Sequence, residues 1–287
     1  MTTTTAAAND GLNKDVSAQD HAPVNGAGGG FNYGGNPLAH LNTGESARYA
    51  AFGGEFQPGL YKPTTERKFA NPAPLGLSAF ALTTFVLSLI NIQNRNLNNP
   101  SIVISLAFGY GGLVQLLAGM WEMAVGNTFG ATALSSYGGF WISVAIVLTP
   151  GGFDIISSLS TATSGVNDFN NSFGFFLAGW FIFTTILLLC TLRSTVAFFL
   201  LFFTLDMAFL FLACGHLTAD SKGNANQHLL SAGGYFGLLA AFLAWYNALA
   251  GIADDSNSFF VIPVAHFPWS VKGRERRAVG KTERETV

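Results

Sequence analysis

The chain has 287 residues, of which 49% are hydrophobic and only 10% are charged, and it contains 27 Phe and 33 Gly. A water-soluble domain of this size needs more charged surface than this composition can supply, so the composition indicates an integral membrane protein. The formal net charge is −2, and the sequence has no basic stripe interleaved with aromatic residues. We therefore expect no nucleic acid as a partner.

Residues 1–60 are polar and glycine-rich, a composition that cannot build a core. We expect a largely disordered cytoplasmic tail, with a semi-ordered segment around Phe52, Phe56 and Tyr61 against the membrane face or a neighbouring subunit. The tail lacks the basic-then-apolar pattern of a cleavable signal peptide, so the first membrane helix is expected to direct insertion.

Six apolar stretches follow, each about the 20 residues that a helix needs to cross the hydrocarbon core. They span residues 74–93, 102–124, 128–148, 173–192, 195–214 and 228–251. The pattern predicts an all-α integral membrane protein with six transmembrane helices within residues 61–255, followed by a C-terminal tail at 256–287. Lys and Arg gather outside the first and last spans, so the positive-inside rule favours cytoplasmic termini. We expect a multi-pass protein of the plasma membrane.

A helix-start signal, Asn followed by Pro, precedes the first span at Asn71 and Pro72. Asn71 is suited to cap the helix with its side-chain oxygen, and Pro72 supplies a preset φ at the first helical position. The free N–H groups and the positive end of the helix dipole would then seat a carboxylate. The alternative is an ordinary helix that enters the membrane at its interface.

Two connections carry structural signals. The Gly126-Asn127-Thr128 neighbourhood is all that joins the second and third spans, which predicts a tight hairpin. The connection from Pro150 to Asn171 is expected to form a short interfacial helix and an external loop.

Three spans carry stripes of small and polar residues at helical spacing, which predicts faces that point into the bundle. The stripe of the second span is Ala107, Gly111, Gln115, Gly119 and Glu122, with Leu113, Leu117 and Met120 elsewhere. The first span aligns Phe80, Thr84, Ser88 and Asn91, and the sixth aligns Gly233, Gly237, Ala240, Ala244, Asn247 and Gly251. Each stripe serves either a transport pathway or helix packing alone.

Two carboxylates fall within predicted spans. Glu122 lies near the end of the second span, where we expect access to water. Asp206 lies well inside the fifth, where an isolated charge costs about 3 kcal/mol or more. Asp206 is therefore expected to be protonated, paired with a group such as Thr or Asn, or exposed to an aqueous cavity. Proton coupling and structural pairing are the two hypotheses for it.

No catalytic, metal or cofactor site is predicted. Cys190 and Cys214 are isolated in apolar surroundings, and His216 and His228 lack the spacing of metal ligands. Without a nucleophile and base pair, a metal set or a cofactor loop, an enzyme is the weakest hypothesis.

Several motifs resemble the acetate uptake transporter family, also called the succinate–acetate permease or YaaH-type family. They are NPAPLGL at 71–77, FGYGGLVQ at 108–115, GMWE at 119–122, GNTFG at 126–130, SYGGFW at 136–141 and WYNALAG at 245–251. The likeness runs from about residue 70 to 255. LSAFALTTF at 77–85 and STV at 194–196 are similar to the fungal branch in particular.

This resemblance implies a six-helix protomer with its own central pathway for acetate and related short monocarboxylates, succinate being a further candidate, in a ring of six protomers. By motif position, Phe80, Tyr137 and Leu205 match the narrow hydrophobic constriction of the family. The residues implied to lie along the substrate route are Asn71, Pro72, Leu75, Phe80, Thr84, Gln115, Glu122, Asn127, Tyr137 and Leu205. Asp206 departs from the family pattern, which has a small apolar residue beside the constriction leucine.

A constriction of this kind admits two routes for an acid: co-transport with a proton, or passage of the anion between polar seats above and below the neck. Asp206 is the candidate for proton coupling. The opposing hypothesis is a non-transporting membrane sensor or regulator of the response to organic acids. A formate or ammonium channel is a third, less favoured because the paired half-helix pattern of such channels is not evident.

Overall fold

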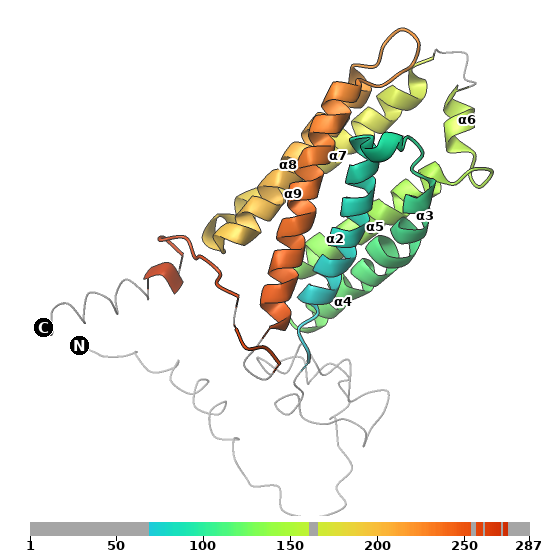
Figure 1. Ribbon diagram of the computed structural model, residues 1–287. Helices are drawn as coiled ribbons and strands as arrows, with labels where there is room; N and C mark the ends of the chain where they lie inside the picture. Colours follow the sequence, from blue (N-terminus) through green and yellow to red (C-terminus); the bar gives the residue numbers. More distant parts are fainter. Residues whose placement is uncertain (1–68, 161–165, 254–256, 261, 271, 275–287) are drawn as a thin grey trace, which may run out of the picture. The chain divides into compact units, whose positions relative to one another are not determined.

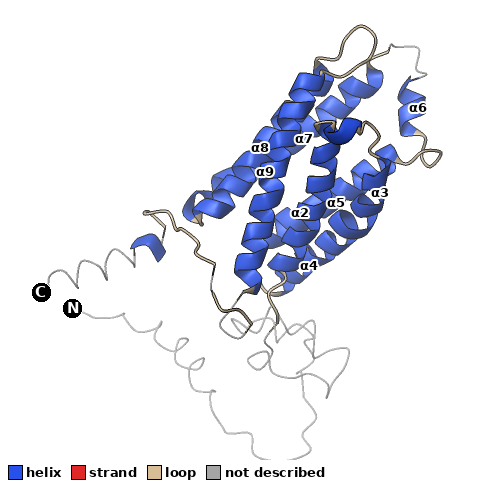
Figure 2. Ribbon diagram, in the orientation of Figure 1, coloured by secondary structure: helices blue, strands red, loops and turns tan. Residues whose placement is uncertain are grey.

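The computed structural model describes residues 69–160, 166–253, 257–260, 262–270 and 272–274. Six helices in this part of the chain are long and apolar enough to cross a membrane, and no strand is formed there (Figure 2). The predicted tail at 1–60, with Phe52, Phe56 and Tyr61, lies outside the described residues, as does residue 61, where the transmembrane unit was predicted to begin.

The elements follow one another along the chain as labelled in Figure 1. They are α2 (Ala73–Asn91), η4 (Asn94–Asn96), α3 (Ser101–Phe108), η5 (Gly109–Val114), α4 (Gln115–Ala124), α5 (Thr128–Leu148), α6 (Ile155–Ser160), α7 (Asp168–Cys190), η6 (Thr191–Arg193), α8 (Val196–Leu217) and α9 (Gln227–Ile252). All six predicted spans are confirmed as helices, and α3, η5 and α4 together form the second.

The fourth span begins at Asp168, five residues before the predicted position 173. Its first turns are polar, but both polar atoms of the Asn170 side chain have hydrogen-bond partners. Nδ2 of Asn170 donates to the carbonyl of Gly223 at 2.8 Å, and Oδ1 lies 2.9 Å from Nδ1 of His216. These tertiary hydrogen bonds allow the helix to start among polar residues. Hydropathy alone predicts that such residues belong to a loop.

The middle of the second span is a π-helical turn, η5, which the sequence analysis did not predict. Its glycines leave room for neighbouring groups, since a Cβ on Gly111 would lie 2.5 Å from Oγ1 of Thr83 in α2. A Cβ on Gly112 would collide with the carbonyl oxygen of Ala107. Single π turns inside α-helices are rare and recur at functional sites. This one ends immediately before Gln115.

The small-residue stripe of α9 serves helix packing. A Cβ on Gly237 would collide with Oγ of Ser88 in α2, and one on Gly233 would lie 2.7 Å from Cγ of Leu212 in α8. Because both glycines permit close approach of a neighbouring helix, α9 fits between α2 and α8. The packing interpretation of this stripe is the correct one at Gly233 and Gly237.

The stripe of the second span faces inward as predicted. Its five members are buried, whereas Leu113, Leu117 and Met120 are about half exposed on the opposite face. The hairpin between α4 and α5 is as tight as predicted, with Gly126 at a φ of 85°. The predicted helix after Pro150 is present as α6, and residues 161–165 beyond it are outside the described part.

The hairpins bring six helix ends together at one end of the bundle. α2, α5 and α8 start there, and α4, α7 and α9 finish there (Figure 1). Residues 262–270, which the sequence analysis left outside the transmembrane unit, run back to this end and contact the turn between α7 and α8. The candidate site opens at the same end.

Candidate functional site

A cavity of about 380 Å³ lies between α2, α4, α5 and α8, and its mouth is at the end of the bundle where these helices start or finish. Ala73, Asn127 and Arg193 line the mouth, and Asn127 and Arg193 are exposed. From Ala73 to Phe80 the helix rises about 10 Å, so Phe80 lies at the inner end. The cavity is therefore a vestibule with a polar entrance and an apolar floor.

The floor brings together Phe80 from α2, Tyr137 from α5 and Leu205 from α8. All three side chains are at most 5% exposed. The ring centroids of Phe80 and Tyr137 lie 6.1 Å apart, and the ring planes are tilted by 46°. We call these three residues the collar. Residues far apart in sequence thus share one lumen, and none of the three faces outward.

The hydroxyl of Tyr137 is committed to its neighbour. Oη of Tyr137 lies 2.9 Å from Oγ1 of Thr184, and Oγ1 of Thr184 donates to the carbonyl of Trp180 at 2.7 Å. A threonine hydroxyl has one hydrogen, so Tyr137 must be the donor to Thr184. Tyr137 therefore has no hydrogen left to offer a carboxylate in the cavity.

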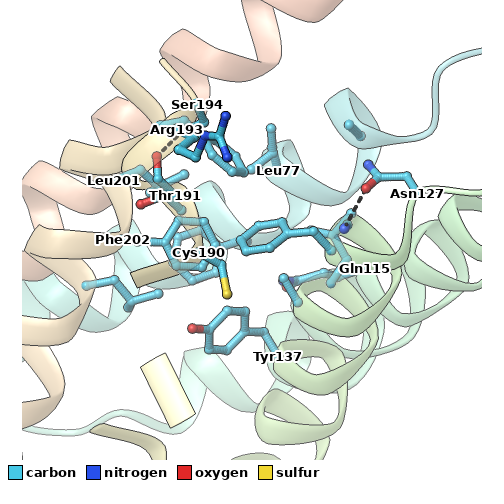
Figure 3. A pocket seen from close by; sticks show the side chains of 18 residues that line it. Leu77, Gln115, Asn127, Tyr137, Cys190, Thr191, Arg193, Ser194, Leu201 and Phe202 are labelled. Carbon is cyan, nitrogen blue, oxygen red and sulfur yellow. Dashed lines mark hydrogen bonds between the residues drawn. The ribbon is translucent and has the colours of Figure 1, made fainter. Parts of the chain in front are cut away.

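Gln115 supplies the polar group next to the collar (Figure 3). Its side chain is completely buried and lines the cavity, yet neither Nε2 nor Oε1 has a hydrogen-bond partner among the described residues. Leaving a buried donor or acceptor unsatisfied costs about 1–3 kcal/mol. A ligand or water in the cavity would satisfy this carboxamide, and its two N–H donors suit a carboxylate.

Glu122 is a positioning residue and does not line the cavity. Its side chain is 2% exposed, so the predicted access to water is wrong for Glu122. Oε2 of Glu122 accepts a hydrogen bond from Nδ2 of Asn127 at 2.6 Å, while Oδ1 of Asn127 caps α5 by accepting from the N–H of Gly130 at 3.0 Å. A Cβ on Gly130 would lie 2.8 Å from Oε2 of Glu122. The carboxylate thereby holds Asn127 at the mouth.

Besides Glu122, four residues predicted along the substrate route do not line the cavity: Asn71, Pro72, Leu75 and Thr84. Oδ1 of Asn71 accepts from the N–H of Ala73 at 3.1 Å, but the helix begins at Ala73 with Pro72 as its N-cap, one residue later than predicted. Leu75 is 50% exposed. Thr84 is buried, and its Oγ1 has no partner among the described residues.

Asp206 is adjacent to Leu205 but does not line the cavity. It is buried, and its Oδ1 lies 3.0 Å from Oγ1 of Thr185 in α7, so the predicted pairing with a polar group such as Thr is present. Oγ1 of Thr185 is also 3.0 Å from the carbonyl oxygen of Phe181. One hydroxyl hydrogen cannot serve both acceptors, and a hydrogen on Asp206 would complete the pair.

The mouth contains residues that the sequence analysis did not assign to the site. Cys190, Thr191, Arg193 and Ser194 line it from the turn between α7 and α8. Arg193 lies between the fourth and fifth spans, away from the basic residues that gather outside the first and last spans. A lone basic residue between two long apolar spans was the available signal, because such a residue must lie at a membrane boundary and near a bundle opening.

The chain is similar to a known protein family and to several named proteins. Residues 52–269 match the model of the GPR1/FUN34/yaaH family. The chain is 68% identical to "Acetate permease A" of Emericella nidulans over 272 residues, which cover 95% of this chain and 88% of that protein. It is 34% identical to "Succinate-acetate/proton symporter SatP" of Escherichia coli K12 over 200 residues, 69% of this chain and 96% of that protein.

A solved structure is similar as well. The structure described as "Structure of the bacterial acetate channel SatP" aligns with a TM-score of 0.57 at 32% sequence identity, covering 69% of this chain and all of that chain.

Proposed function

The chain belongs to the GPR1/FUN34/yaaH family, and from that premise we propose that it carries acetate and related short monocarboxylates across a membrane through the cavity within each protomer. Succinate is a further candidate substrate, because it is named for the bacterial relative. Carriage of an acid needs no covalent chemistry, so we assign the chain no enzymatic reaction.

The observation that carries this proposal is the unpaired carboxamide of Gln115 beside an apolar collar. Acetate has one charged end and one methyl end. The carboxylate would accept hydrogen bonds from Nε2 of Gln115, while the methyl group would contact Phe80 and Leu205. A dry, weakly polar site of this kind excludes hydrated ions, since they would lose water without adequate replacement.

The route we propose runs from the mouth at Arg193 and Asn127 to Gln115, and then through the collar. The collar offers no donor, because the hydroxyl of Tyr137 is committed to Thr184. An acid therefore crosses it either as the neutral species or as an anion that exchanges one polar seat for another. We retain Asp206 as the candidate for proton coupling, acting from behind Leu205 rather than from the lumen.

Uptake of labelled acetate into vesicles that contain only the purified protein tests the proposal. We expect saturable uptake that unlabelled acetate inhibits. A sensor or regulator would move no acetate, and a channel for ammonium or formate would show stronger inhibition by those ions than by acetate. Protein-free vesicles measured in parallel report the leak of neutral acetic acid through the lipid.

We also propose the placement and assembly of the chain: plasma membrane, cytoplasmic termini and a ring of six protomers. Large apolar side chains that are about half exposed or more, such as Leu117 in α4 and Phe175, Ile182 and Leu189 in α7, supply faces for lipid or for neighbouring protomers. The mass of the purified protein in detergent distinguishes six copies from one, and protease access to a C-terminal tag in sealed cells reports the orientation.

A further inference from the structure

A second cavity, of about 500 Å³, lies outside the mouth of the first. Its walls come from the turn between α7 and α8, the last turns of α9 and the C-terminal segment, which we define as residues 262–270 and 272–274. Arg193, Ser194 and Phe198 line both cavities. The two cavities are therefore adjacent, and Arg193 lines both (Figure 3 shows Arg193 among the side chains that line the first).

The C-terminal segment is fixed to the helical bundle by specific contacts. The N–H of Val196 donates to the carbonyl of Ala265 at 2.8 Å, and Thr195 and His266 form an isolated antiparallel bridge. Nε1 of Trp269 donates to the carbonyl of Leu192 at 2.7 Å. These backbone and indole hydrogen bonds hold the segment at one position beside the α7–α8 turn, so the cavity wall it forms is a built feature.

The second cavity has a positive lining. Arg193, His266 and Lys272 line it, and Asn247 adds a carboxamide. No acidic residue is among its described lining residues, and no carboxylate in the described part of the chain forms an ion pair with Arg193 or Lys272. A concave site lined by one sign of charge raises the local concentration of the opposite ion.

We propose that this second cavity is an anteroom for carboxylate anions, built by the C-terminal segment, that concentrates the substrate at the mouth of the transport cavity. The inference rests on the proposed function and adds a binding site to it. Lys272 and His266 bring positive charge and a polar imidazole to the outer wall, and Arg193 passes the anion to the inner cavity. Because Arg193, Ser194 and Phe198 line both cavities, the transported acid is a better candidate for binding in the second cavity than other anions are.

The experiment measures acetate entry from the side that carries the segment. Proteoliposomes of the full chain are captured through a tag on the C-terminus, so that this end faces the labelled acetate. We expect Lys272→Gln and His266→Gln each to raise the half-saturating acetate concentration, with the maximal rate unchanged. Because Lys272→Gln removes one exposed charge, we expect it to raise the half-saturating concentration about two- to fivefold. The increase should be smaller at high salt, which screens the charge.

Arg274→Gln is the matched control, because Arg274 carries the same charge two positions after Lys272 and does not line the cavity. An equal effect of Lys272→Gln and Arg274→Gln would overturn the anteroom, since general surface charge would then suffice. Repeating the assay in vesicles of neutral phosphatidylcholine separates the sources of the anion. An effect of Lys272→Gln that requires anionic lipid would assign the cavity to a lipid headgroup and overturn the proposal.

The two proposals fail in different ways. Absence of acetate uptake by the unaltered chain contradicts the proposed function itself. Normal uptake by the unaltered chain, with no change in the half-saturating concentration for Lys272→Gln or His266→Gln, contradicts only the anteroom. A changed maximal rate with an unchanged half-saturating concentration also contradicts it, because an anteroom acts on capture of the anion.

Discussion

Replacing Gln115 by leucine separates its role in binding from its effect on stability. The two side chains are similar in size, so the substitution removes the carboxamide without leaving a large void. In the unliganded protein, Gln115 is fully buried with both polar atoms unpaired among the described residues. Replacing an unsatisfied polar group with an apolar one of similar shape is neutral or stabilising. Gln115→Leu should therefore bind acetate more weakly and unfold at a higher temperature.

Both magnitudes follow from the contacts. A hydrogen bond to a charged group contributes about 1.5–3 kcal/mol, which corresponds to an increase of about 10- to 100-fold in the dissociation constant of acetate. Removing the unpaired carboxamide should raise the free energy of unfolding by about 1 kcal/mol or more. Acetate at ten times its Kd should stabilise the unaltered protein by about 1.4 kcal/mol, and the same concentration should stabilise Gln115→Leu by about 0.4 kcal/mol or less.

The assays are acetate uptake in vesicles and thermal unfolding in detergent with and without acetate. Thr84→Val is the matched control, because Oγ1 of Thr84 is also buried and unpaired among the described residues but lies outside the cavity. It should raise stability without changing acetate affinity. Unchanged acetate affinity in Gln115→Leu would refute the assignment of this residue as the polar seat. Weaker affinity in Thr84→Val would return Thr84 to the substrate route that the sequence predicted.

Three further outcomes are expected. Phe80→Ala and Leu205→Ala should each widen the collar and admit bulkier acids such as lactate, which competition between lactate and labelled acetate measures; unchanged preference in both variants counts against the collar. Tyr137→Phe should leave acetate affinity within about twofold, because the hydroxyl donates to Thr184, and should lower the free energy of unfolding by about 0.5–1.5 kcal/mol. Asp206→Asn should flatten the pH dependence of acetate uptake if this carboxyl couples proton movement; an identical pH profile would leave Asp206 a packing residue.

Local sequence signals predicted the helices well, but they predicted only some of the directions in which the side chains point. Hydropathy located all six spans, and glycine and Asn127 located the hairpin before α5. Burial of a side chain in lipid and burial in protein give the same apolar signal, so hydropathy could not tell that Leu75 faces outward. The spacing of Gln115 and Glu122 put both on one face, yet only Gln115 reaches the cavity.

Other features depend on contacts between distant segments, which no local pattern contains. The π turn at Gly109–Val114 forms where α2 approaches the glycines, and the early start of α7 depends on hydrogen bonds from Asn170 to residues about fifty positions later. The C-terminal segment follows the last long apolar span and contains two prolines, so the sequence analysis assigned it to a tail. Its order comes from hydrogen bonds to the α7–α8 turn, including the one from Trp269 to Leu192.

The distribution of hydrogen-bond donors explains why a short acid would suit this cavity. Of the described polar side chains that line the cavity, only Gln115 has buried polar atoms without a hydrogen-bond partner, so a carboxylate there has one place at which to recover part of its lost hydration. An acid with a short apolar end can occupy that place while its methyl group contacts the collar, which gains about 0.8 kcal/mol for each buried carbon. A longer or hydroxylated acid would force the collar apart or bury a second polar group without a partner, at a cost of about 1–3 kcal/mol. On this proposal, a preference for short monocarboxylates would follow from the scarcity of donors at the floor as much as from the width of the collar.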